Sequence, residues 1–203
     1  MTFKSFYESM NYTDEMKDWF EQRTKKHIGR VQKYAKKIED YDKRYEGLSK
    51  QTEEHDKSKL EDDVEKIPYI FISWDYHCKD LGKDYTMPDG VKDKCNEATL
   101  HHVKVNKHHP ECWAGDTANI NTKDRDAVPD QLVDATKMPD IYVAEMMADW
   151  LAMSEEKGSS VKDWADKNVN KRWKFTDEQK DIIYNLINAI PVETEQDERF
   201  DNR

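Results

Sequence analysis

Cysteines are few in this sequence, and long apolar runs are missing. The 203 residues include three cysteines, none of them in a Cys-x-x-Cys pair. An odd number of widely spaced thiols argues against a disulfide framework and favours a reducing compartment. No stretch reaches the roughly 18 apolar residues that a membrane span needs, and residues 1–10 hold no apolar core of a secretion signal. We therefore expect a cytoplasmic protein, in the host cytoplasm if a phage encodes it, with no membrane partner.

Positive charge is also in deficit. The chain has 33 lysines and arginines against 43 aspartates and glutamates, which gives a formal net charge of −10. Such a field repels the backbone of nucleic acids, so we expect no long nucleic acid as a partner. A bound divalent ion is a strong local positive charge and can attract a phosphate against the net field. A small phosphoester such as a nucleotide is therefore compatible with this composition.

Glycine and proline occur only six times each and serve mainly to separate stretches of helical periodicity. Apolar residues make up 36% of the chain, but six tryptophans, ten tyrosines and six phenylalanines can build an aromatic-rich core. The segment 68–82 is also compatible with a strand by propensity, although its length favours a helix. The patterns together predict an all-α fold with helices over 14–45, 51–63, 68–82, 91–107, 140–156 and 176–190 and a short helix around Trp164.

The chain length fits one domain, which we expect to span residues 1–191. The tail 192–203 is acidic and has little to bury, so it is predicted to lack a fixed structure. The polar segment 111–138 is predicted to be a long surface excursion, of the kind that often forms a lid.

The dipeptide His55-Asp56 is the first candidate metal-binding feature. On one turn of the predicted helix 51–63, these neighbours can offer a nitrogen and an oxygen to adjacent metal positions. A helix this charged is equally typical of a solvated face. The dipeptide therefore needs support from residues elsewhere in the chain.

His27 and Asp149 give that support because each lies on an otherwise apolar helical face. Buried ionisable groups need partners, since an unpaired charge in the interior costs several kcal/mol or more. Each residue taken alone is compatible with an ordinary hydrogen-bonded core position. Together with His55 and Asp56 they form a mixed nitrogen and oxygen donor set that suits Mn, Fe, Co, Ni or Zn.

A second candidate feature is the segment 101–111, which holds four of the seven histidines. If the helix continues through it, His102 and His109 share one stripe with Asn106, while His101 and His108 share the adjoining stripe. Either stripe could face a metal ion. The alternative is a hydrophilic helix end whose imidazoles have no metal role.

The thiols allow a different interpretation, a structural zinc site drawn from His77, Cys78, Cys95, His108, His109 and Cys112. Such sites usually contain closely spaced ligand pairs, and the cysteines here are too far apart for that pattern. We favour the interpretation of the cysteines as small buried apolar residues.

The order of these residues resembles the HD superfamily of metal-dependent phosphohydrolases. The segment His55-Asp56-Lys57-Ser58-Lys59 is similar to the H-D-x-x-K form of the family signature, and Ala148-Asp149-Trp150-Leu151 is similar to the A-D-x-L segment that carries its last metal-binding aspartate. The segments 106–113 and 145–150 also resemble a family of phage and bacterial proteins of HD type that has no assigned activity. The resemblance spans about residues 27–153 and implies an HD-domain-like helical bundle with a central metal site.

Carried over to this sequence, the resemblance implies a first ion bound by His27, His55, Asp56 and Asp149. Asp56 would bridge to a second ion, for which His102, His108 and His109 are candidate ligands. The pair His108-His109 followed by Glu111 is similar to the H-H-E segment of cyclic-dinucleotide phosphodiesterases in the superfamily. The G-Y-P-type sequence that should follow is absent, which argues against that activity.

The implied function is hydrolysis of a phosphoester in a small molecule, such as a nucleotide, with one or two divalent transition-metal ions. The predicted catalytic residues are Asp56, which holds the ions, Lys59, which neutralises a phosphate oxygen, and Glu111, which orients a ligand or accepts a proton. Glu145 is an alternative to Glu111 in that role. Two other functions are compatible with the pattern, an HD-type di-iron oxygenase with His77 as a further ligand and a non-catalytic phage-type binding protein on the same scaffold.

Overall fold

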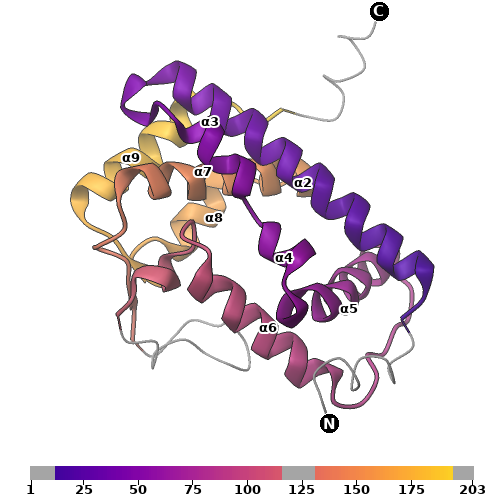
Figure 1. Ribbon diagram of the computed structural model, residues 1–203. Helices are drawn as coiled ribbons and strands as arrows, with labels where there is room; N and C mark the ends of the chain where they lie inside the picture. The colour runs from indigo at the N-terminus through magenta and orange to yellow at the C-terminus, as the bar shows by residue number, and fades with distance from the viewer. Residues whose placement is uncertain (1–11, 116–130, 194–203) are drawn as a thin grey trace, which may run out of the picture.

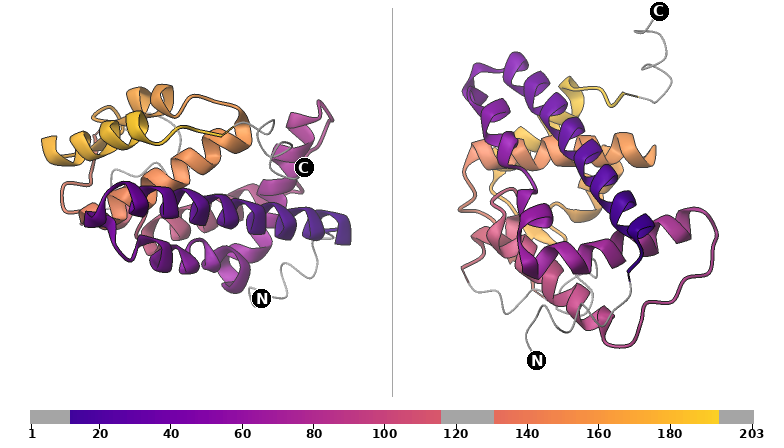
Figure 2. Two further views of the ribbon diagram at one scale, coloured as in Figure 1. Left: turned by 90° about the horizontal axis from the view of Figure 1, so that it is seen from above. Right: turned by 45° about the vertical axis from the view of Figure 1, so that its right-hand side comes forward.

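The computed structural model describes residues 12–115 and 131–193, and these residues are mostly helical, as expected (Figure 1). Helix α2 (Asp14–Tyr41) begins at Thr13, whose hydroxyl accepts a hydrogen bond from the Met16 N–H. It packs against α7 (Asp140–Lys157). On its other side α7 contacts α8 (Val161–Asn168) and α9 (Asp177–Ala189), so α7 lies between α2 and the last two helices (Figure 2).

The chain between α2 and α5 is more broken than the sequence predicts. Helix α2 ends at Tyr41 rather than at residue 45, because Asp42 is extended and its carboxylate caps the next turn. Short helical pieces follow, a 3-10 turn at Lys43–Tyr45, α3 (Leu48–Gln51), a 3-10 turn at Thr52–Glu54 and α4 (Lys57–Glu61). The predicted helix 51–63 is therefore wrong as a continuous element.

The break within that predicted helix falls at the His55-Asp56 dipeptide. His55 has φ −56° and ψ 128°, and Asp56 has φ 57°, in the left-handed region that non-glycine residues seldom adopt. The two side chains therefore project from a bend between helices instead of from one helical turn.

Helices α5 (Asp63–Asp80) and α6 (Val91–Val105) pack against each other, and α5 also contacts α2. Helix α5 begins five residues before the predicted start, because Asp62 accepts a hydrogen bond from the Val64 N–H and caps it there. Pro68 thus lies inside the helix. Helix α6 ends at Val105, so the histidines at 108 and 109 lie beyond it and do not continue its stripes.

The predicted surface excursion 111–138 is tied to the core at both ends. A 3-10 turn spans Pro110–Trp113, and β1 (Val133–Asp134) pairs in parallel with β2 (Trp173–Lys174). Ala135 and Met138 are buried, which a free surface loop would not require. The middle of the predicted lid, 116–130, lies outside the described residues.

The predicted tail begins with a fixed segment. The Glu193 N–H donates to the Tyr34 hydroxyl, and its carboxylate pairs with Lys33 and Lys37 on α2. The rest of that tail, 194–203, lies outside the described residues. Among the described helices, none is both long and apolar enough to cross a bilayer.

Two hydrophobic cores flank the position of the candidate site. The larger core gathers the C-terminal part of α2 around Val31 and Ile38 with α7 and α9. The smaller core gathers Phe20 of α2 with Ile70 of α5 and the start of α6. His27 lies on α2 between the two, at the junction where a polar site can be enclosed by apolar packing.

Candidate metal centre

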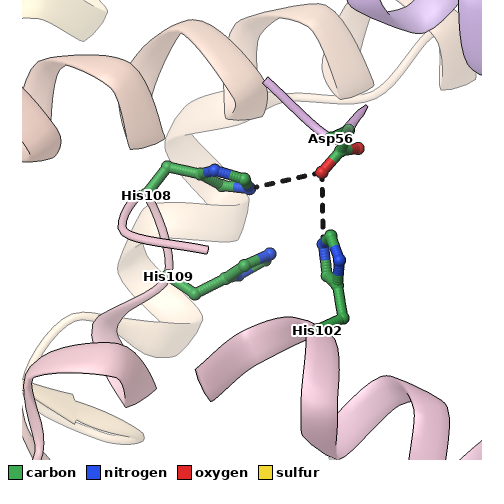
Figure 3. A group of neighbouring side chains, drawn as sticks. All are labelled: Asp56, His102, His108 and His109. Atoms are coloured by element: carbon green, nitrogen blue, oxygen red, sulfur yellow. Dashed lines mark ion pairs between the residues drawn. The ribbon is translucent and has the colours of Figure 1, made fainter. Parts of the chain in front are cut away.

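The carboxylate of Asp56 is the central group of the site. Its Oδ1 lies 3.1 Å from His102 Nε2 and 3.6 Å from His108 Nε2 (Figure 3). Its Oδ2 lies 3.7 Å from His27 Nε2 and 3.8 Å from His55 Nε2. Each oxygen of one buried carboxylate therefore faces a different pair of imidazole nitrogens.

The first donor group is formed by His27, His55 and Asp149. His27 comes from α2, His55 from the bend before α4, and Asp149 from the middle of α7. Asp149 Oδ1 lies 3.1 Å from His27 Nε2 and 3.9 Å from His55 Nε2. One donor atom from each residue falls within 4.8 Å of the others, and Asp56 Oδ2 borders the group.

The second donor group is formed by Asp56, His102, His108 and His109, whose donor atoms also lie within 4.8 Å of one another. His102 comes from the last turn of α6, and the other two histidines come from the bend that follows (Figure 3). The three rings point toward the same space as Asp56 Oδ1. The bend after Val105 turns both His108 and His109 toward His102. A continuous helix would have placed only His109 on the same stripe as His102.

The nitrogen and oxygen atoms that face inward fit a divalent metal ion. Among the described residues, His55 Nε2 is buried without a hydrogen-bond partner, and the buried atoms Asp56 Oδ1 and His102 Nε2 have only an ion-pair contact of 3.1 Å with each other and the more distant His108 Nε2. Leaving such groups unsatisfied costs about 1–3 kcal/mol each, and more for a charged group. Imidazole and carboxylate donors in this mixture suit Mn, Fe, Co, Ni or Zn. The residues present therefore fit one ion in each donor group, with Asp56 shared.

Glu145 contacts two of the histidines through their Nδ1 atoms, on the side of each ring that faces away from Asp56. Its Oε1 accepts a hydrogen bond from His55 Nδ1 at 3.0 Å and lies 3.5 Å from His108 Nδ1. Its Oε2 accepts a hydrogen bond from Gln51 Nε2 at 2.5 Å. A carboxylate in this position fixes the tautomer and leaves each Nε2 lone pair facing the site. Glu145 thus has the orienting contact that the sequence offered as one of two options.

Glu65 plays the same part for His102 and is a residue that the sequence did not indicate. It is fully buried on α5, and its Oε2 lies 2.8 Å from His102 Nδ1. Its Oε1 lies 2.9 Å from His101 Nδ1, so His101 belongs to a separate group with Glu65 and Asp62. The signal was hidden because Glu65 lies in a densely charged stretch that precedes the predicted start of the helix.

The electrostatics keep the carboxylates ionised. Burial disfavours the charged form of Asp56, but Lys59, His55 and His102 outweigh it and hold the pKa of Asp56 well below its usual range. Burial likewise opposes ionisation of Glu145, but His108 and His55 lower its pKa to about 2. The pKa of His108 is lowered by burial and by the neighbouring His55. A neutral imidazole is the form that can donate its lone pair to a metal ion.

The donor groups open onto a cavity of about 1300 Å³. Its wall includes His27, Asp56, Asp149, His102 and His109. Lys59 lies on the same wall, with its Nζ 2.6 Å from Asp56 Oδ2. A ligand in this cavity can therefore reach both donor groups and a lysine.

Glu111 is a member of neither donor group. It is buried, and its Oε1 accepts a hydrogen bond from Trp173 Nε1 at 3.0 Å and lies 3.8 Å from the Arg172 guanidinium. These contacts connect the turn after α6 to the segment of β2. Glu111 belongs to none of the donor groups found among the described residues, so its predicted role as an orienting residue or proton acceptor stays a prediction.

The residues of the alternative interpretations also lie elsewhere. The His77 ring stacks on Trp19 with centroids 3.7 Å apart and joins none of the donor groups found among the described residues. Cys78 and Cys95 are buried, as expected for small apolar residues, and Cys112 is partly exposed. No cysteine of the described part of the chain takes part in a donor group.

The fold and the site define a mostly helical protein with clustered histidine and carboxylate groups able to hold metal ions. A family model matches residues 16–189, and its description is "Family of unknown function (DUF5662)". The match covers most of the chain, so the protein belongs to this family. Searches among curated proteins and among solved structures returned no match.

Proposed function

We propose that the protein is a metal-dependent phosphohydrolase of HD type that acts on a phosphoester in a small molecule, such as a nucleotide. The observation that carries the proposal is the position of Asp56, with one carboxylate oxygen facing each of two histidine groups. Two ions held close together by a shared carboxylate are typical of sites that hydrolyse phosphoesters. The fit of the order of ligands to the HD signature supports the same reaction class.

The side chains divide the work between ion binding and substrate binding. His27, His55 and Asp149 would hold one ion, and His102, His108 and His109 the other. When bound, such ions supply a nucleophile from water at neutral pH and polarise a phosphoryl oxygen. Lys59 would bind an anionic oxygen of the substrate as a point charge.

The cavity supports a small organic substrate over inorganic phosphate alone. Ligand pockets usually measure about 300–1,000 Å³, and the volume here is about 1300 Å³. Tyr69, Tyr76 and Trp150 line it in addition to the polar groups of the donor set. Aromatic rings beside a phosphate-binding site suit a phosphoester with a planar group, which is why we propose a nucleotide.

The test combines elemental analysis of the purified protein with a phosphatase screen of mononucleotides in the presence of Mn²⁺, Co²⁺ or Ni²⁺. We expect one or two bound ions per chain and release of phosphate by the native protein. Asp56→Asn should lose both, since it removes the charge that the two donor groups share. Glu155→Gln, a change to a buried carboxylate of α7 outside the donor groups, should keep both.

Three outcomes would overturn the proposal. A native protein that binds no ion and releases no phosphate refutes metal-dependent hydrolysis. Bound iron with an oxygen-dependent product would replace it with the oxygenase alternative, although His77, the added ligand that we expected there, stacks on Trp19. Metal binding without turnover of any substrate would favour the non-catalytic binding protein.

A further inference from the structure

Lys59 occupies the position of a counter-ion to the buried Asp56. Its Nζ lies 2.6 Å from Asp56 Oδ2, the same oxygen that faces His27 Nε2 and His55 Nε2. The Asp56 side chain is only 1% exposed. A carboxylate at this depth without a cation would be strongly destabilising. Lys59 therefore supplies the positive charge that the first donor group needs in the protein without metal.

An ion bound in the first donor group and the Lys59 ammonium compete for that oxygen. Both use the lone pairs of Asp56 Oδ2, while the other carboxylate of the group, Asp149, has its Oδ1 directed at His27 and His55. A metal ion and the Lys59 ammonium that both contact one oxygen in a poorly hydrated interior repel each other strongly. Binding of the ion therefore requires Lys59 to leave Oδ2.

The side chain of Lys59 has a place to go. It is 21% exposed and lies on the wall of the cavity. Its Nζ already lies 5.2 Å from the centroid of the Tyr69 ring, a contact that can hold an ammonium group. The flexible four-carbon stem lets the ammonium turn into the cavity, where an anion in reach of the donor groups would lie.

We propose that Lys59 is a placeholder cation that couples metal binding to anion binding. It neutralises Asp56 while the first donor group is empty, yields Oδ2 to the incoming ion and then binds the anionic group of the ligand. The inference rests on the metal-binding part of the proposed function and adds to it a mutual dependence of two ligands. By thermodynamic linkage, an anion that captures Lys59 strengthens binding of the ion, and the ion strengthens binding of the anion by the same factor.

The experiment measures Mn²⁺ binding by the electron paramagnetic resonance signal of the free ion, with and without inorganic phosphate. Lys59→Met should bind Mn²⁺ at least about tenfold more tightly than the native protein without phosphate, because a charge-assisted hydrogen bond no longer competes. Added phosphate should tighten Mn²⁺ binding to the native protein and leave that of the variant unchanged. Lys57→Met is the matched control, since Lys57 pairs with the exposed Glu54 and should behave as the native protein.

Lys59→Gln guards against a variant that fails to fold, because glutamine keeps a neutral donor beside Asp56 and should also bind Mn²⁺ more tightly. A native protein that binds Mn²⁺ at least as tightly as both Lys59 variants overturns the placeholder role and leaves the proposed hydrolysis standing. Tighter binding by the variants with no phosphatase activity in any protein supports the placeholder and refutes the hydrolysis. A native protein that binds no ion overturns both.

Discussion

Replacement of Glu145 by glutamine should weaken both halves of the metal centre at once. Its Oε1 accepts from His55 Nδ1 at 3.0 Å and lies 3.5 Å from His108 Nδ1, so one carboxylate orients a ligand in each donor group. Burial opposes its charge, but His108 and His55 lower its pKa to about 2, so the charge is present at neutral pH. Glutamine keeps the size and one acceptor oxygen, removes the charge and replaces the second acceptor oxygen by an NH2 donor.

Loss of an orienting carboxylate of this kind usually costs about 10- to 100-fold in metal affinity, which is about 1.4–2.7 kcal/mol per ion. We expect Glu145→Gln to raise the Kd of both ions by a factor in this range, because His55 and His108 serve different groups. The assay is competition for Zn²⁺ against a chromophoric chelator, which resolves two binding steps when both sites fill.

The control is Glu155→Gln, further along the same helix. Glu155 is also buried, but its carboxylate accepts hydrogen bonds from Lys33 and Tyr34 and not from histidines. This variant should lower the free energy of unfolding and leave both Zn²⁺ affinities unchanged. The reasoning is refuted if Glu145→Gln binds both ions as tightly as the native protein, or if the two variants lose affinity equally.

Four further outcomes are expected. An ion at 100 times its Kd should stabilise the native protein by about 2.7 kcal/mol, seen as a higher Tm that a chelator reverses; an unchanged Tm would contradict binding to the folded state. Burial lowers the pKa of His55, but Asp56, Glu145 and Asp149 outweigh it and raise the pKa above its usual value. Since the imidazolium must lose its proton to bind a metal, the metal affinity measured by calorimetry should fall as the pH drops through and below that raised pKa, and protons should be released on binding. A metal affinity that does not change with pH would exclude His55 as a ligand. Glu65→Gln should weaken only the ion held by His102, so a loss at both binding steps would count against two separate groups. Tyr34→Phe leaves the Glu193 N–H without its partner and removes one of the two hydrogen bonds to Glu155 Oε2, which Lys33 still contacts, and should cost about 1–3 kcal/mol in urea unfolding; a smaller change would mean that water replaces the hydroxyl.

The sequence anticipated the helical class of the fold because its apolar residues recur at helical spacing over long stretches. It anticipated the residues that converge because His27 and Asp149 stand out against the apolar neighbours on their helical faces. It did not anticipate how they converge. The bend at His55 and Asp56 depends on a left-handed backbone conformation, and a charged stretch around it gives no periodic signal of a break.

Hydrophobic periodicity also could not predict the contacts between charged residues that are distant in the sequence. Glu65 and Glu111 are both buried glutamates, and Glu65 contacts His102 of the donor groups whereas Glu111 contacts Trp173 and Arg172. The choice depends on which helix packs beside α6, and a tertiary contact of this kind leaves no mark on local spacing. The same reason hid the attachment of Glu193 to α2.

Position 56 has two separate requirements, a residue that adopts a left-handed backbone conformation and a carboxylate that faces both donor groups. A left-handed conformation costs most L residues about 1–2 kcal/mol, and aspartate and asparagine are among the few that adopt it readily. The residue that joins the two donor groups is thus also one of a few that the chain accepts at the bend. Alanine here would disturb the direction of the backbone together with the chemistry, whereas asparagine keeps the bend and changes only the side-chain chemistry, since it removes the charge and replaces one acceptor oxygen by an NH2 donor. Asp56→Gly would keep the bend and remove the side chain. Comparing Asp56→Ala with Asp56→Gly therefore separates the effect of the backbone path from the effect of losing the Asp56 carboxylate.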